Sequence, residues 1–330
     1  METISVRKRF VWIDWMKVIG ITLVVFGHFH TSWAKYVYVF HVPLFFLISG
    51  MLSKVETDNK VFWKKIWFNL IVPLLIICNV KFFLGNLIHY QGFESLLYNI
   101  VILNAKMLLG KIDGVLVTCW FIYTLIFLKI LYQYTSRLSI FVSVLFIVAS
   151  IVIKNELIGY AFDNSLLNVL LAYPFFVMGN IIHPYLGNIG NRQIGKVDLF
   201  LLPIALFTVY FLAMINGTVD VCYFSYGNNV IFFIIGSLMG TIFVYEISKM
   251  FEHIDKACLR TLSLGTIVIL GFHGLFVSHL FSKIVGGQNL LAILFSMIIV
   301  LLFVPIIYFV EKHIPYLVGI KRIHDKFIGS

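Results

Sequence analysis

The chain has 330 residues, of which 61% are hydrophobic and only 12% are charged, and its mean hydropathy is +0.98. A soluble domain is roughly half apolar and a quarter charged, so this composition excludes a soluble protein and indicates a membrane protein. The formal net charge of +10 does not indicate nucleic-acid binding, because most basic residues lie in short loops between apolar runs, where membrane topology accounts for them.

Apolar runs long enough to cross a bilayer recur along the whole chain. They predict an all-α fold, a polytopic membrane helix bundle of about ten transmembrane helices that forms a single domain over 1–330. The segment 93–116 is interrupted by polar residues and predicts an interfacial or re-entrant helix. The alternative is an eleventh span within 93–110, which the distribution of basic residues disfavours. The ten expected spans are residues 13–31, 36–53, 66–88, 117–133, 138–153, 166–184, 198–216, 228–247, 264–283 and 289–310.

The basic residues set the expected orientation. With ten spans, one set of loops and ends holds 17 of the 25 Lys and Arg residues, and the other set holds 5. The positive-inside rule then places both termini in the cytoplasm, with 311–330 as a short basic cytoplasmic tail. The start Arg7-Lys8-Arg9 resembles the beginning of a signal peptide, but no small-x-small cleavage pattern follows, so we expect an uncleaved first span.

The four cysteines predict neither a metal site nor a disulfide framework. Cys78, Cys119, Cys222 and Cys258 share no C-x-x-C spacing, and three of them lie in or beside apolar segments. Small buried hydrophobic residues are the expected role. The chain also has no P-loop, G-x-G-x-x-G, H-E-x-x-H or G-x-S-x-G motif, so we predict neither a redox cofactor nor a structural metal.

The stretch 10–53 carries the strongest candidates for chemistry. Lys17 and His28 are eleven residues apart, which places them on one face of a helix and about 16 Å apart along it. An ionisable side chain inside a span is a functional hypothesis, because burying it without a partner is costly. The alternatives are a neutral His28 hydrogen-bonded in the bundle and a Lys17 that reaches the headgroups. Asp14, three residues before Lys17, can pair with it.

Five further residues are weaker candidates. His41 opens the second span and can orient His28, bind substrate or simply be solvated, and Ser49 lies near the end of the same span. Lys64 and Lys65 stand at the cytoplasmic start of the third span, where they can anchor the protein or bind phosphates. His273 lies midway along the ninth span and, like His28, is expensive to bury unpaired.

The order of these motifs resembles the membrane-bound acyltransferase 3 family, closest to its fucose 4-O-acetylase-like and sugar O-acetyltransferase branch. The resemblance begins at W-I-D-W-M-K-V-I-G-I-T-L-V-V-F-G-H and continues with F-H-V-P-L-F-F-L-I-S-G and W-K-K-I-W-F-N-L-I-V-P. Trp120-Phe121, Y-P-F-F-V-M-G, Y-G-N-N-V-I-F-F and the G-F-H at His273 follow in the expected order. Lys17 stands where many members have arginine, and 93–116 matches no family block.

The resemblance implies transfer of an acetyl or other short acyl group from cytoplasmic acetyl-CoA, the acyl-CoA donor, to a hydroxyl of a cell-surface polysaccharide or a lipid-linked sugar. His28 would be the general base or, in a variant, the acylated nucleophile. Asp14 and Lys17 would shape the donor path, and Lys64 and Lys65 would hold the phosphates of the donor. His41, Ser49, Trp120 and His273 would contact substrate or support the site.

Two other classes remain compatible with the residues alone. A transporter or flippase for a glycan or lipid-linked sugar would also place His and Lys inside the membrane. A non-catalytic membrane subunit would leave Lys17 and His28 without a role. We expect a multi-pass protein of the cell membrane without nucleic-acid partners, and we keep a homodimer open as its assembly.

Overall fold

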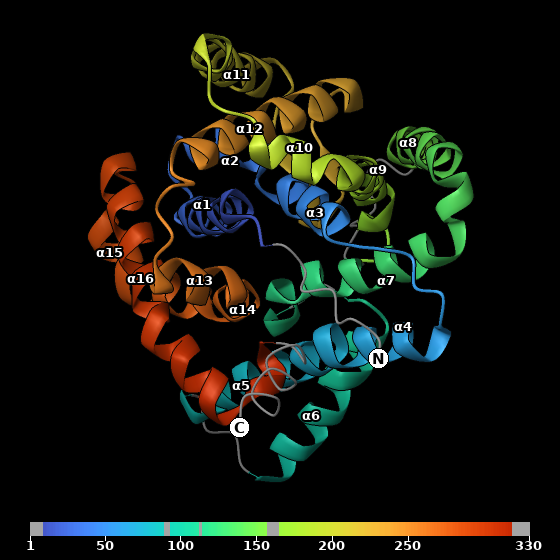
Figure 1. Ribbon diagram of the computed structural model, residues 1–330. Helices are drawn as coiled ribbons and strands as arrows, with labels where there is room; N and C mark the ends of the chain where they lie inside the picture. The colour runs from blue at the N-terminus through green and yellow to red at the C-terminus, as the bar shows by residue number, and fades with distance from the viewer. Residues whose placement is uncertain (1–8, 89–92, 112–113, 157–164, 319–330) are drawn as a thin grey trace, which may run out of the picture.

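The structure is a computed structural model, which describes residues 9–88, 93–111, 114–156 and 165–318. It is a bundle of α-helices (Figure 1), and it confirms the predicted all-α membrane fold. The described residues also contain a pair of short strands of two residues each. Two parts of the topology prediction lie outside the described residues. They are the basic residues Arg7 and Lys8 at the start and the end of the C-terminal tail, 319–330.

The helices follow the predicted runs closely, with additional breaks. The first half contains α1 (Val11–Gly27), α2 (Ala34–Tyr38), α3 (His41–Met51), α4 (Asn59–Ile66), the π-helical turn η1 (Trp67–Ile71), α5 (Val72–Ile88), α6 (Phe93–Leu108), the 3₁₀ turn η2 (Gly114–Thr118), α7 (Trp120–Thr135), the 3₁₀ turn η3 (Ser136–Leu138) and α8 (Ser139–Glu156). The second half contains α9 (Asn168–Ile182), η4 (His183–Tyr185), α10 (Leu186–Asn191), α11 (Lys196–Ile215), β1 (Val219–Asp220), η5 (Val221–Tyr223), β2 (Ser225–Tyr226), α12 (Val230–Met250), α13 (Ala257–Leu264), α14 (Thr266–Phe276), the π-helical turn η6 (Val277–Phe281), α15 (Ser282–Val285), α16 (Asn289–His313) and η7 (Pro315–Leu317).

Within the described residues, seven helical stretches are long and apolar enough to cross a membrane, or eight if the bent pair α13–α14 is one span. The number of stretches is smaller than the ten predicted spans partly because α1 is not counted. It has 17 residues, and a stretch of 18 is the minimum counted as a span. In addition, α7 and α8 together form one stretch of 35 residues, Trp120–Lys154. The predicted number of ten and the cytoplasmic position of the termini therefore stay predictions.

Three predicted spans contain breaks that the apolar pattern does not reveal. The first ends as a helix at Gly27, so His28 caps α1 and does not lie within it. The second is divided between α2 and α3. The ninth begins after a bend of 82° between α13 and α14. Residues 93–108 of the predicted interfacial segment do form a helix, α6, whose position relative to the bilayer stays a prediction.

Helix α1 lies at the centre of the bundle (Figure 1), between α12 on one side and α13 and α14 on the other, with α3 and α16 completing its surroundings. Apart from Asp14 and Lys17, its residues are almost all apolar on every side of the helix. Trp12, Met16, Ile21 and Val25 are each at most 1% exposed. A helix that is hydrophobic all round is stable only when neighbours or lipid cover it on every side. This central position makes α1 the element against which the other walls of a site can be built.

Helices α3 and α9 cross at backbone contact. A Cβ at Gly50 of α3 would lie 2.9 Å from the carbonyl carbon of Phe176, and one at Gly179 of α9 would lie 2.8 Å from the amide nitrogen of Met51. Real Cβ atoms essentially never come closer than 3.0 Å to such atoms. Small residues at the crossing are typical of helix packing in membranes, and Gly50 and Gly179 allow the two backbones to come this close.

A polar network secures the end of α3. Ser53 Oγ donates to the carbonyl oxygen of Ser49 at 2.7 Å and accepts from Lys129 Nζ at 2.6 Å. Asn180 Nδ2 of α9 donates to the carbonyl oxygen of Ser53 at 2.8 Å. The last carbonyls of a helix have no partner within it, so these side chains satisfy them and fix α3 along its axis.

Candidate active site

A cavity of about 280 Å³ lies between α1, α3, η2 and α7, α14, and the β1–η5 segment. His28, His41 and His273 all line it, and we call it the histidine pocket. The sequence indicated these three residues separately, from three different spans, and the fold brings them together. Trp120, which was named only from the family resemblance, lines the same pocket.

Each of the three imidazoles is held by the same kind of hydrogen bond. Nδ1 of His28 lies 2.8 Å from the carbonyl oxygen of Val24, and Nδ1 of His41 lies 2.9 Å from that of Val37. Nδ1 of His273 lies 2.9 Å from the carbonyl oxygen of Ile269. A carbonyl oxygen only accepts, so Nδ1 carries the proton in each ring and Nε2 of the neutral imidazole keeps a lone pair.

His28 and His273 form a pair inside the pocket. Their ring centroids are 4.6 Å apart and the rings are nearly perpendicular, at 78°. His273 is only 2% exposed, and its Nε2 has no hydrogen-bond partner among the described residues. A buried nitrogen without a partner is costly, so this Nε2 is a candidate for hydrogen bonding to a group that enters the pocket.

Aromatic side chains form an apolar wall beside this pair. Phe121 stacks on Phe46 of α3, with centroids 4.7 Å apart, and contacts Trp120 edge-on at 6.1 Å. Phe45, Trp120 and Phe121 line the pocket. Low polarity beside ionisable groups strengthens electrostatic interactions within the site and limits access of bulk water.

The hairpin between α11 and α12 contributes a further wall that sequence reasoning missed. In the antiparallel pair β1–β2, Val219 is opposite Tyr226, and η5 lies between the two strands. Asp220 and Tyr223 line the pocket together with His30 from the loop after α1. Burial raises the pKa of the Asp220 carboxyl above its usual range. One signal was available, because Asp220 is the only acidic residue between positions 199 and 245.

Asp14 lies in an ionic cluster beyond Thr266, a lining residue of the pocket at the start of α14. Ser263 Oγ donates to Asp14 Oδ1 at 2.5 Å, and Arg9 Nε donates to Asp14 Oδ2 at 2.6 Å. Arg9 also bonds Asp255 at 2.9 Å. Asp255 has a second partner in Arg260 at 2.7 Å. Asp14 therefore ties the start of α1 to α13, just before the bend that leads into the pocket.

Lys17 is not among the lining residues, although it occupies the expected stripe of α1. The pocket touches α1 at Ile21 and Val24 and then at His28, so Lys17 stands one turn before the first of these contacts. Its proposed contact with the donor stays a prediction.

Ser49, Lys64 and Lys65 also lie away from the pocket lining. Ser49 is near the end of α3, two turns beyond His41. Lys64 and Lys65 occupy the last turn of α4, where Lys65 Nζ pairs with Glu56 at 2.6 Å. The structure does not bring these three residues to the histidines, and their roles stay predictions.

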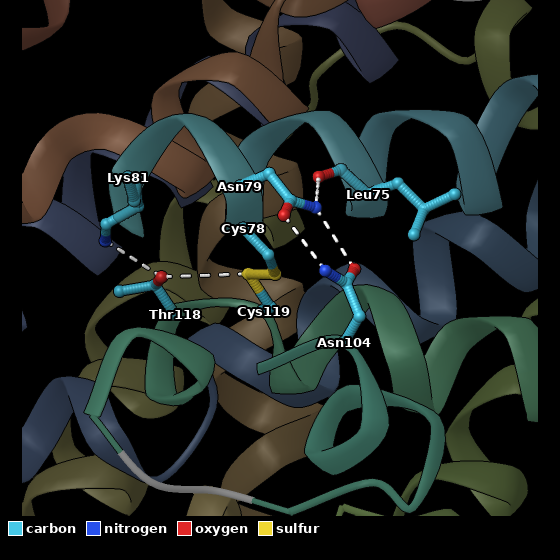
Figure 2. Close-up of a disulfide and its surroundings, with 7 residues drawn as sticks. All are labelled: Leu75, Cys78, Asn79, Lys81, Asn104, Thr118 and Cys119. Carbon is cyan, nitrogen blue, oxygen red and sulfur yellow. Dashed lines mark hydrogen bonds between the residues drawn. A yellow bond between two sulfur atoms is a disulfide. The ribbon is translucent and has the colours of Figure 1, made fainter. Parts of the chain in front are cut away.

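Cys78 and Cys119 form a disulfide (Figure 2), so the expectation that the cysteines form no disulfide was wrong for this pair. The two residues are 41 positions apart in the chain, and the expectation rested only on local spacing. Cys222 is free and buried, as predicted, and Cys258 is free and half-buried. The bond joins α5 to the segment between η2 and α7, next to the pocket residues Thr118 and Trp120.

Within the described ranges, no group of three or more His, Cys, Asp or Glu side chains is arranged to hold a metal ion. The sequence model of the acyltransferase 3 family, described as an acyltransferase domain, matches residues 10–309. No curated protein and no solved structure matches the chain.

Proposed function

Because the chain belongs to the acyltransferase 3 family, we propose that it is a membrane O-acyltransferase of the cell membrane, in the sugar O-acetyltransferase branch. The donor is acetyl-CoA or another short acyl-CoA from the cytoplasm. The acceptor is a hydroxyl of a cell-surface polysaccharide or of a lipid-linked sugar. The family match supports this class over the transporter or flippase alternative.

The observation that carries the proposal is the state of His28 in the pocket. Its Nδ1 is bonded to the carbonyl oxygen of Val24, so Nε2 is the basic nitrogen. Acyl transfer from a thioester requires a base for the attacking hydroxyl and a donor for the oxyanion. A ring fixed by its own helix supplies the first requirement without reorganisation.

The reaction then proceeds in two stages. Nε2 of His28 takes the proton of the acceptor hydroxyl as its oxygen bonds to the thioester carbonyl carbon, and the π electrons move to the carbonyl oxygen. That electron pair returns as the C–S bond breaks, and the thiolate takes the proton from the imidazolium. In the variant with an acyl-histidine, Nε2 bonds to the thioester carbonyl carbon and the C–S bond breaks to release the thiolate. The acceptor oxygen then bonds to the acyl carbon as the C–N bond to Nε2 breaks, and the hydroxyl proton passes to the thiolate.

Other pocket residues have supporting roles in this proposal. His273, with its buried Nε2, binds or orients the acceptor hydroxyl beside His28. His41 and Trp120 bound the space available to the acyl group. Asp14 and Lys17 shape the route by which the donor reaches the pocket from the cytoplasmic side. For Lys64 and Lys65 we keep the weaker proposal that they hold the phosphates of the donor.

The test uses inside-out membrane vesicles from cells that make the acceptor, with radiolabelled acetyl-CoA as the donor. We expect His28→Ala and His28→Asn to lower acetyl transfer by about 10²-fold or more. Asn keeps a donor near the position of Nδ1 and so preserves the bond to Val24, which separates loss of the base from loss of stability. His253→Ala is the matched control, because His253 is exposed on a loop.

Undiminished transfer by well-expressed His28→Asn would remove His28 from the mechanism. A wild-type protein that moves labelled glycan across the vesicle membrane but transfers no acetyl group would instead favour the transporter.

A further inference from the structure

Lys81 is an ionisable residue of the bundle to which the proposed mechanism gives no role. It lies on α5, one turn after Cys78, and its Nζ donates to Thr118 Oγ1 at 2.8 Å (Figure 2). Lys81 forms no salt bridge with any residue that the structure describes. A cation in a membrane span without a carboxylate partner is expensive to retain, and such residues mark functional sites. The side chain turns toward the bundle, although its sequence position was also compatible with reaching outward to the surface.

Thr118 connects this cation to the histidine pocket. Val117, Thr118 and Trp120 all line the pocket. None of the described lining residues is a lysine or an arginine. The ammonium group of Lys81 is held behind the pocket wall, where the Thr118 hydroxyl lies between it and the cavity.

The surroundings fix this arrangement. The disulfide Cys78–Cys119 joins the helix that carries Lys81 to the residue that follows Thr118. Asn79, also on α5, exchanges hydrogen bonds with Asn104 of α6 at 3.0 and 3.2 Å (Figure 2). The disulfide and the amide pair both start from α5, within one turn of Lys81, and they hold α5 against the segment that carries Thr118 and against α6. A preorganised electrostatic site requires this kind of support.

We infer that Lys81 and Thr118 stabilise the oxyanion formed from the thioester carbonyl, an inference that rests on the proposed acyltransferase function. An ammonium group only donates hydrogen bonds, so Thr118 Oγ1 accepts from Lys81. Its own hydroxyl hydrogen faces the disulfide sulfur Cys119 Sγ at 3.9 Å, a weak acceptor, and turns to the stronger acceptor when the oxyanion forms. The neighbouring cation strengthens that donor. As the acceptor oxygen bonds to the carbonyl carbon, the displaced π pair gathers on the carbonyl oxygen, which the Thr118 hydroxyl then binds. Lys81 is a positioning residue that acts through Thr118.

The experiment measures initial rates in the same vesicles, with endogenous acceptor and varied radiolabelled acetyl-CoA. We expect Lys81→Met and Thr118→Val each to lower the maximal rate by about 10²-fold, the effect typical of a lost oxyanion donor, with the KM for acetyl-CoA changed by less than about threefold. Because the two residues act as one unit, the double variant should be little worse than either single variant. Lys81→Arg and Thr118→Ser should restore most of the rate.

The matched control is Lys129→Met. Lys129 is also a lysine of a membrane helix that donates to a hydroxyl, Ser53 Oγ at 2.6 Å, but neither residue lines the pocket. Its loss can reduce stability, measured by size-exclusion chromatography of the detergent-extracted protein, while the rate per folded molecule stays within about twofold. If Lys81→Met does not fold, Thr118→Val carries the test, because it removes only the hydroxyl.

Three outcomes overturn the inference. They are a normal maximal rate in Thr118→Val, an effect of Lys81→Met confined to KM, and additive losses in the double variant. A wild-type protein that transfers no acetyl group would refute the proposed function itself. Loss of activity in His28→Asn together with normal rates in Lys81→Met and Thr118→Val would refute this inference alone.

Discussion

Substitution of Gly50 by alanine should damage both the stability and the activity of the protein, because α3 and α9 meet there at their backbones. An added Cβ would overlap the carbonyl oxygen of Phe176 and lie 2.9 Å from its carbon. Restoring an ordinary contact of 3.4 Å to that carbon alone requires a shift of about 0.5 Å, and the oxygen requires more. Neither partner is a flexible side chain, so the helices themselves must move apart.

Overpacking of this kind costs about 1–3 kcal/mol, and a contact between two backbones belongs at the upper end of that range. For a chain of this size we expect the apparent melting temperature to fall by about 3–5 °C. The shift also displaces His41 and Phe45, which α3 contributes to the histidine pocket. Acetyl transfer per folded molecule should therefore fall as well, by about tenfold or more, as expected for a misplacement approaching 1 Å.

The assay is thermal unfolding of detergent-extracted protein followed by size-exclusion chromatography, combined with the vesicle transfer assay. Gly85→Ala is the matched control, because Gly85 is also helical and an added Cβ there meets no atom within 4 Å. Alanine is the better helix former, so this variant should be unchanged or slightly more stable. A Gly50→Ala protein that melts with the wild type would refute the tight crossing of α3 and α9.

Two further predictions concern the ionic cluster at Asp14 and the disulfide. Hydrogen bonds from its two arginine partners lower the pKa of Asp255 from 3.8 to about 2. A carboxyl whose pKa is lower in the folded state stabilises the fold above its unfolded value, and this contribution is lost as the pH falls from 4 toward 2. The melting temperature of wild type should therefore fall more over this range than that of Asp255→Asn, and parallel curves would contradict the pairing. Alkylation of the denatured, unreduced protein should label only Cys222 and Cys258, and reduction should add Cys78 and Cys119. Four labels without reduction, detected by mass spectrometry, would exclude the disulfide.

The sequence predicted the fold class and three of the pocket residues for one physical reason. Inside a membrane every ionisable group is conspicuous, because its burial without a partner is costly. His28 and His273 stand out in runs of apolar residues, and they prove to be neighbours at 4.6 Å. His41 follows from the same reasoning, although its sequence position was equally compatible with a solvated end of a span.

Local sequence patterns could not predict two kinds of feature, the breaks within helices and the contacts between segments that are distant in the chain. Apolar periodicity gives no sign of the 82° bend before α14, which brings Thr266 to the pocket. The Cys78–Cys119 bond joins segments whose proximity is set by packing, so spacing along the chain carries no information about it. Asp220 reaches the pocket through a hairpin in the loop between α11 and α12. A single carboxyl in a loop between spans is common, so the sequence alone does not single it out.

The three imidazoles share one way of being held inside the bundle. His28 caps α1, His41 stands at the junction of α2 and α3, and His273 lies one turn before the π-helical turn η6. Near helix ends and irregular turns, a backbone carbonyl is accessible for a second hydrogen bond through its other lone pair. Each ring donates from Nδ1 to the carbonyl oxygen four residues earlier, on α1 for His28, on α2 for His41 and on α14 for His273, and this leaves Nε2 as the basic nitrogen. The bond that satisfies Nδ1 therefore also fixes the tautomer with a basic Nε2, which the proposed acyl transfer requires, and the breaks in the helices shape the histidine pocket.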